Sequence, residues 1–256
     1  MKSLLTGLLA SGLVLGGISS VQAIGLEAAV GCWLQNPGGS IAYKSAIVND
    51  SIDLDGDSGY DNELRLMARV NIDMPLIIPN VVAMATPMEF SGRGNKNLDF
   101  SFGDISFRGG VPFDSKIVLD HYDVGLYYGV PLLETATLNT LRVDFGINVR
   151  LLKVEAEVSQ NTLGKEDSVA ETFILPMGYL AVQVTPIEAL AFTVEVRGLA
   201  YSGNHYYDLI ARARYTITGP VFVAAGWRVE DVKISEKDIE AKLDFSGPFA
   251  EFGLNF

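Results

Sequence analysis

The chain has 256 residues, of which 48% are hydrophobic, and a formal net charge of −12 at pH 7. This acidic balance argues against a nucleic-acid partner, because phosphates require a basic surface. A single cysteine excludes an internal disulfide framework, and no cofactor is expected.

The first 23 residues have the features of a signal peptide. Met1 and Lys2 form a basic start, residues 4–18 are apolar, and Val21-Gln22-Ala23 is a small-x-small cleavage site. An uncleaved anchor is the alternative, but the apolar run is shorter than the roughly 20 residues of a spanning helix. We therefore predict a signal peptide at 1–23 and one barrel domain at 24–256.

Strand-like alternation dominates the rest of the chain. A transmembrane strand alternates lipid-facing and lumen-facing residues over roughly 9–11 positions. Within 140–150 the aliphatic and aromatic residues fall on one face and the polar residues on the other, and 62–73, 189–201 and 208–217 repeat the pattern. A soluble β-sandwich also alternates, but repeated arginines opposite unbroken aliphatics favour a barrel.

We predict an all-β protein, a transmembrane antiparallel up-and-down β-barrel of about 10 strands. An even count suits a barrel with both termini on the same side, and eight strands would remain if 80–90 or 239–247 lay outside. Connections 37–60, 91–115 and 153–169 are predicted to be long loops. The predicted strands are 24–36, 61–73, 80–90, 116–128, 139–152, 170–184, 189–201, 206–218, 220–234 and 239–256.

The last nine residues alternate up to the final phenylalanine. Phe252, Leu254 and Phe256 share one face, and the segment looks like the C-terminal strand of a bacterial outer-membrane barrel, whose terminal aromatic is read by the barrel-assembly machinery. The resemblance implies the cell outer membrane of a Gram-negative bacterium, with both termini periplasmic.

Three further segments carry a family resemblance. Residues 74–80 resemble the Pro-x-Leu-x-Pro-Asn turn of a family of small, mostly uncharacterised Gram-negative outer-membrane β-barrel proteins. Residues 175–179 resemble its Leu-Pro-Met-x-Tyr segment, and 243–256 its terminal Gly-Pro strand. The family implies fold and location and no established activity.

The predicted lumen is highly charged, and its arginines and carboxylates nearly balance. One interpretation is a structural plug of paired charges, and the alternative is a porin-like passage for small solutes. Such a passage would be narrow, because ten strands leave an interior mostly filled by side chains. The predicted inward residues are Glu27, Glu63, Arg65, Arg69, Asp73, Asp123, Arg142, Asp144, Arg150, Glu195, Arg197, Asp208, Arg212, Arg214, Arg228, Glu230 and Glu251.

Only two histidines are present, and both are weak catalytic candidates. His121 with Asp123, or His205 with Asp208, would imitate the rim sites of outer-membrane proteases and lipid A hydrolases or acyltransferases. No motif of those enzymes is present, so an enzyme is the less favoured alternative to a structural barrel.

The first long loop is acidic, and Asp53, Asp55 and Asp57 begin like a calcium loop. Ser58 and Leu64 replace the glycine and the closing glutamate that such a loop needs. Bridging by divalent cations to lipopolysaccharide or outer-membrane lipids remains a hypothesis beside a solvated acidic loop. The aromatic girdles at the two membrane interfaces are predicted to contain Tyr122, Tyr127, Tyr128, Tyr179, Tyr201, Tyr206, Tyr207 and Trp227.

Overall fold

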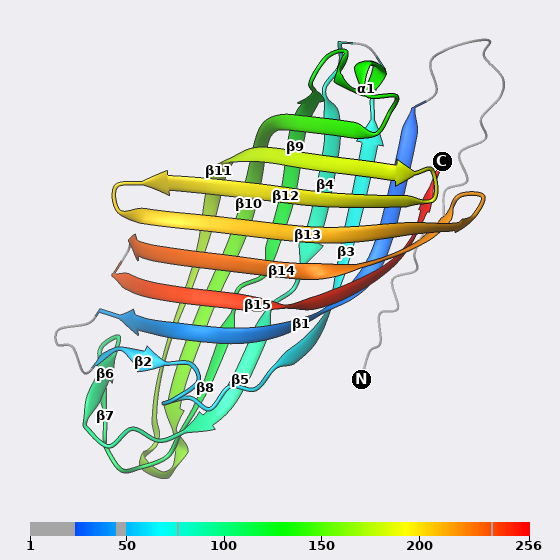
Figure 1. Ribbon diagram of the computed structural model, residues 1–256. Helices are drawn as coiled ribbons and strands as arrows, with labels where there is room; N and C mark the ends of the chain where they lie inside the picture. The colour runs from blue at the N-terminus through cyan, green and yellow to red at the C-terminus, as the bar shows by residue number, and fades with distance from the viewer. Residues whose placement is uncertain (1–23, 45–49, 76, 237) are drawn as a thin grey trace, which may run out of the picture.

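The computed structural model describes residues 24–44, 50–75, 77–236 and 238–256, so the predicted signal peptide lies outside it. Ten of the described strands form a closed antiparallel barrel (Figure 1), in which each strand pairs with its neighbour and β10 pairs with β11 to complete the ring. The prediction of ten strands is confirmed. In order around the barrel they are β1 (Gly25–Tyr43), β3 (Glu63–Asp73), β4 (Asn80–Thr86), β9 (His121–Gly129), β10 (Leu141–Gln160), β11 (Lys165–Ile187), β12 (Leu190–Tyr201), β13 (Asn204–Thr218), β14 (Val221–Glu236) and β15 (Ile239–Asn255).

The first and last of these strands close the ring. β1 pairs with β15 from Glu27↔Asn255 to Tyr43↔Ile239, and the backbones of Leu26 and Phe256 exchange hydrogen bonds of 3.0 and 2.9 Å. Closure leaves no unpaired sheet edge along this part of the wall.

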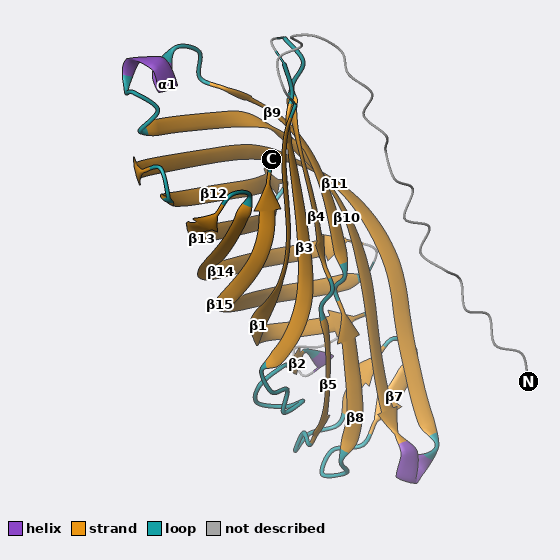
Figure 2. Ribbon diagram, turned by 90° about the vertical axis from the view of Figure 1, so that its right-hand side faces the viewer, coloured by secondary structure: helices purple, strands orange, loops and turns teal. Residues whose placement is uncertain are grey.

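The two ends of the barrel differ. What we call the terminal end contains the start of β1, the C-terminus, short turns and the helix α1 (Leu133–Ala136). The opposite loop end contains β2 (Ile52–Asp53), β5 (Glu89–Gly94), β6 (Phe100–Phe102), β7 (Ile105–Phe107), β8 (Phe113–Val118) and the 3-10 turn η2 (Asn161–Leu163). Figure 2 shows the two sets at opposite ends of the molecule.

Several strands run further toward the loop end than the sequence predicts. The predicted loop 153–169 is mostly a hairpin in which β10 and β11 remain paired out to Gln160↔Lys165. The predicted loop 91–115 is shortened on both sides, because β5 pairs with β8 in register Glu89↔Val118 to Gly94↔Phe113. These two loop predictions were wrong in extent, and so was the predicted loop 37–60, because β1 remains paired with β15 out to Tyr43.

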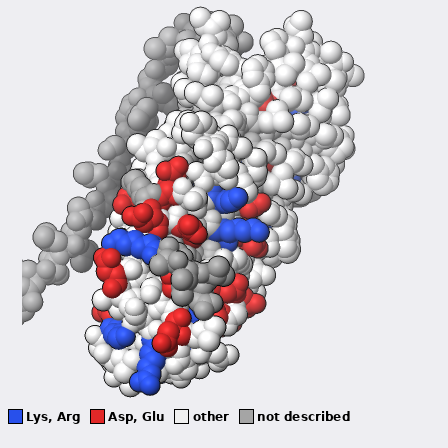
Figure 3. All heavy atoms as spheres, turned by 90° about the vertical axis from the view of Figure 1, so that its left-hand side faces the viewer, with Lys and Arg blue, Asp and Glu red and all other residues white. Residues whose placement is uncertain are grey.

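The outer surface changes character along the barrel axis. Figure 3 shows acidic and basic side chains gathered over the loop end, while the adjoining wall carries almost none. That wall is formed by outward aliphatic and aromatic residues such as Leu66, Ile147 and Ile174, which are 77, 63 and 70% exposed. No helix among the described residues is long and apolar enough to cross a membrane.

Candidate functional site in the barrel lumen

At one level of the barrel the polarity of the side chains reverses on both faces of the wall, and β10 shows the change most clearly. Inward side chains are polar up to Arg150 and apolar from Leu152 to Val158, while outward side chains are apolar up to Leu151 and charged from Lys153 to Glu157. Leu141–Leu151 is therefore the membrane-facing part, and its 11 residues match the length a tilted strand needs to cross a bilayer.

We call the polar interior of the membrane-facing part the charged layer. It contains seven arginines and seven carboxylates, which balance in formal charge. These residues are Arg69, Arg142, Arg150, Arg197, Arg212, Arg214, Arg228, Glu27, Asp123, Asp144, Glu195, Asp208, Glu230 and Glu251.

Asp208, on β13, lies at the centre of this layer and is fully buried. Its carboxylate accepts hydrogen bonds from Arg228 Nε and Nη2 at 2.9 and 2.8 Å, and from Arg150 Nη2 at 2.5 Å. Arg197 Nη1 lies 3.7 Å away. Three buried guanidinium groups thus share this carboxylate, and each also has another acidic partner; the planar forks of arginine suit such sharing.

A second group lies toward the terminal end. Glu195 pairs with Arg69 and, at 2.9 Å, with Arg197, which links this group to Asp208. Glu251 accepts from Arg212 Nε at 2.7 Å. The predicted lumen residues on opposite walls are therefore brought together.

Arg142 and Arg214 surround a polar vestibule at the terminal end. Arg142 Nε lies 2.9 Å from Asp144, and its Nη2 lies 3.1 Å from Asp73. The cavity has a volume of about 160 Å³, and Glu195 and Arg212 are among the residues that line it. Glu63 and Arg65 lie away from the vestibule on β3, and they are partly exposed, with a separation of 3.7 Å.

His121 lies inside the wall rather than at the rim, which corrects the predicted position. Its ring is fully buried, Nδ1 donates to the carbonyl of Leu119 at 3.1 Å, and Nε2 lies 3.2 Å from Glu230 and 3.1 Å from Arg228. Asp123 is equally buried and binds Arg150 and Asn148. The expected rim pair of His121 and Asp123 is thus part of the buried charged layer.

Aromatic rings cover the buried arginines, an arrangement that was not predicted from the sequence. Arg228 lies 4.8 Å from the Trp33 ring, Arg150 4.6 Å from Tyr206, and Arg197 5.4 Å from Tyr179. Such cation–π contacts replace part of the hydration that a buried guanidinium loses. Tyr127, Tyr179 and Tyr206 therefore belong to the lumen, whereas the other residues predicted for the aromatic girdles are exposed.

On the loop-end side of the charged layer, the lumen is filled by a group of apolar side chains that we call the apolar plug. Phe90 stacks on Phe245 at 5.5 Å, and Phe100 lies 5.3 Å from both Phe107 and Phe113. All five rings are at most 2% exposed. The plug is built by the inward faces of the extended strands together with the chain between β5 and β8, and Trp33 lies at its base.

The remaining candidate residues lie at the loop end. His205 Nε2 is 3.2 Å from Asp231, not from the predicted Asp208, and its ring stacks on Tyr207 at 5.1 Å. Asp53 accepts hydrogen bonds from the backbones of Asp55 and Gly56, while Asp57 pairs with Lys96 at 3.3 Å. Among the described residues, no group of acidic, histidine or cysteine side chains has the arrangement of a metal site.

No protein-family model and no curated protein matches the chain. Solved structures of outer-membrane β-barrel proteins resemble it in fold. The outer-membrane protease OmpT of Escherichia coli shares 10% identity over 91% of this chain and 96% of its own, with a TM-score of 0.49. The NalP translocator domain of Neisseria meningitidis shares 14% over 91% and 89% (TM-score 0.45), and Ail of Yersinia pestis 9% over 90% and 99% (TM-score 0.40). At this similarity they carry no argument about activity.

Proposed function

We propose that the chain is an integral outer-membrane β-barrel with a structural role, whose lumen is closed to solutes. The observation that carries the proposal is that side chains fill the lumen in two consecutive sections. In the charged layer, buried Asp208 binds Arg150 and Arg228, and the apolar plug follows on the loop-end side. Neither filling leaves the continuous polar lining that an aqueous channel requires.

The proposed orientation places both termini in the periplasm and the loop end outside the cell. Short turns at the terminal end and long connections at the loop end support it. Residues 1–23 would direct export, and Phe252, Leu254 and Phe256 would form the signal read by the assembly machinery. Outward lysines at or above the membrane boundary, Lys153, Lys233 and Lys242, favour contact with lipopolysaccharide phosphates.

A narrow polar pore is the second candidate, and the terminal-end vestibule favours it. The vestibule penetrates to Glu195 and Arg212, so a transient opening of the charged layer would let small ions advance. The plug would still block them. A rim-sited enzyme has less support, since His205 contacts Asp231 and Tyr207 in a partly exposed position.

Planar-bilayer recording of the refolded protein tests the proposal. Folding is first checked by faster migration of the unboiled protein in a detergent gel, and a general porin in the same bilayer serves as the positive control. We expect no unitary conductance steps. Reproducible steps from the folded protein would replace the closed barrel by the narrow-pore candidate.

A further inference from the structure

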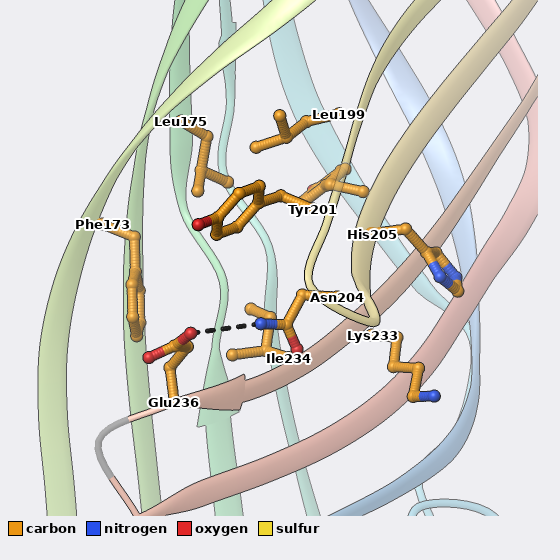
Figure 4. Close-up of a pocket in the computed structure, with 10 residues that line it drawn as sticks. Phe173, Leu175, Leu199, Tyr201, Asn204, His205, Lys233, Ile234 and Glu236 are labelled. Atoms are coloured by element: carbon orange, nitrogen blue, oxygen red, sulfur yellow. Dashed lines mark hydrogen bonds between the residues drawn. The ribbon is translucent and has the colours of Figure 1, made fainter.

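A second cavity lies toward the loop end, and we call it the side pocket. Phe173 and Leu175 of β11, Leu199 of β12 and Ile234 of β14 line it (Figure 4). These four residues pack against the apolar plug but are only partly buried. The pocket is therefore a place where the plug's packing is incomplete, and its volume is about 160 Å³.

The wall is open beside this pocket. Pairing between β11 and β12 ends at Gly178↔Gly198, although β11 continues to Lys165 and β12 to Tyr201. Pro176 lies two residues beyond the last pair and has no N–H to donate to a neighbouring strand. The edges that carry Leu175 and Leu199 are thus not joined by a hydrogen-bonded ladder.

A shallow hollow on the lipid-facing side leads to the same break. Leu180, Val196 and the glycine pair Gly178 and Gly198 line it, and Leu199 lines both this hollow and the side pocket. Gly178 helps to keep the hollow open, since the only atom near a Cβ at this position would be the Gly198 oxygen, at 3.7 Å. The lipid-facing hollow and the side pocket therefore meet at Leu199, beside the break in the wall.

Polar groups frame the mouth of the pocket. Asn204 Nδ2 donates to Glu236 Oε1 at 3.2 Å, and Figure 4 shows this bond beside the Tyr201 ring, which lies between Leu175 and Leu199 on one side and Asn204 on the other. An apolar interior with a few polar groups at its edge is the usual composition of a small-molecule site. Apolar cavities of about 150 Å³ stay dry and bind benzene.

We propose that the side pocket binds a hydrocarbon group of about the size of a benzene ring, taken from the bilayer through the break between β11 and β12. The group is either a small free hydrocarbon dissolved in the membrane or the end of a lipid acyl chain. Both sources share the chemistry that the pocket recognises, and the experiment below separates them.

The test uses the full barrel in lipid nanodiscs, with ¹³C-labelled methyl groups and benzene as the probe. We expect the methyl signals of Leu199 and Ile234 to shift saturably. The lipid-facing Ile147 methyl should shift in simple proportion to added benzene, because it senses only partitioning. Leu199→Trp should fill the pocket and abolish the saturable shift of Ile234, whereas Val182→Trp, outward on β11 and outside the hollow, should preserve it. Phe173→Trp is the second filling variant if Leu199→Trp does not fold.

Nuclear Overhauser contacts recorded without benzene identify the source. Contacts between the Leu199 methyls and acyl-chain terminal methyls indicate a bound lipid chain, while saturable benzene binding without them indicates a free hydrocarbon. The proposal is overturned if neither appears, or if the saturable shift survives in both folded filling variants.

Discussion

Asp208→Asn tests whether the charged layer is held together by compensation of buried charge. In the folded protein the Asp208 carboxylate faces Arg150, Arg197 and Arg228, at 2.5, 3.7 and 2.8 Å. The amide of asparagine fills the same space but leaves these guanidinium groups with one negative charge fewer. Removing one partner of a buried ion pair costs about 3–5 kcal/mol, and we expect a loss of that size in the free energy of unfolding.

Urea unfolding of the refolded barrel in lipid vesicles, followed by tryptophan fluorescence, measures this loss. Glu63→Gln is the matched control, because its pair with Arg65 is partly exposed and 3.7 Å long, and such pairs contribute about 0–1 kcal/mol. If Asp208→Asn cost no more than Glu63→Gln, the layer would be solvated and the argument from buried charge would be refuted.

A double-mutant cycle separates charge compensation from loss of packing. Arg228→Met alone leaves Asp208 and Glu230 with less positive charge, while the double variant with Asp208→Asn removes both members of the Arg228–Asp208 pair. We expect the double variant to be less destabilised than the sum of the single variants, since neighbouring sites couple. Simple additivity would show that the pair does not interact.

Three further measurements examine the wall and the plug. Ile147→Arg, on the lipid face, should lower the free energy of unfolding by about 2–4 kcal/mol, whereas Glu157→Arg, outward on the same strand but beyond the membrane, should change it by less than about 0.5 kcal/mol; equal effects would contradict the assigned boundary. Cys32 is outward on β1, so a lipid-soluble maleimide should label it in vesicles and a charged thiol reagent should not; equal labelling by both would place it in water. Burial in the plug raises the pKa of Tyr60 to about 12, so the ultraviolet difference between wild type and Tyr60→Phe should show a phenol that ionises near pH 12. The stability that Tyr60 contributes should fall as pH rises from about 10 toward 12. An ionisation midpoint near pH 10 would contradict its burial.

The strand count was predictable because the bilayer imposes period-2 alternation on every spanning strand. The extension of β10 was missed for a physical reason. Val154, Ala156 and Val158 face inward and Lys153, Glu155 and Glu157 face outward, so the parity of the strand continues unbroken. In this part of β10 the apolar residues face inward and the charged residues face outward, the reverse of the membrane-facing part. The sequence prediction assumed apolar residues outside and charged residues inside, so it assigned this segment to a loop.

The pairing within the lumen was less predictable. Parity placed Arg150, Asp208 and Arg228 inward, but their mutual contacts depend on how strands far apart in sequence curve toward one another. Tyr206 was predicted to lie in an aromatic girdle but lies in the lumen. It shares its face with Asp208 two positions later, and its hydroxyl donates to Glu230 at 2.7 Å, so parity was a better guide than its closeness to a strand end.

The central claim is that the apolar plug keeps water out of the lumen above the charged layer. Paramagnetic relaxation of methyl groups by a water-soluble gadolinium chelate tests it, with the folded barrel in nanodiscs. We expect Ile117, Val154 and Leu243, at most 3% exposed, to be unaffected while the exposed Leu98 methyls relax strongly. Strong relaxation of the three interior residues as well would show that water fills the lumen and would contradict the account.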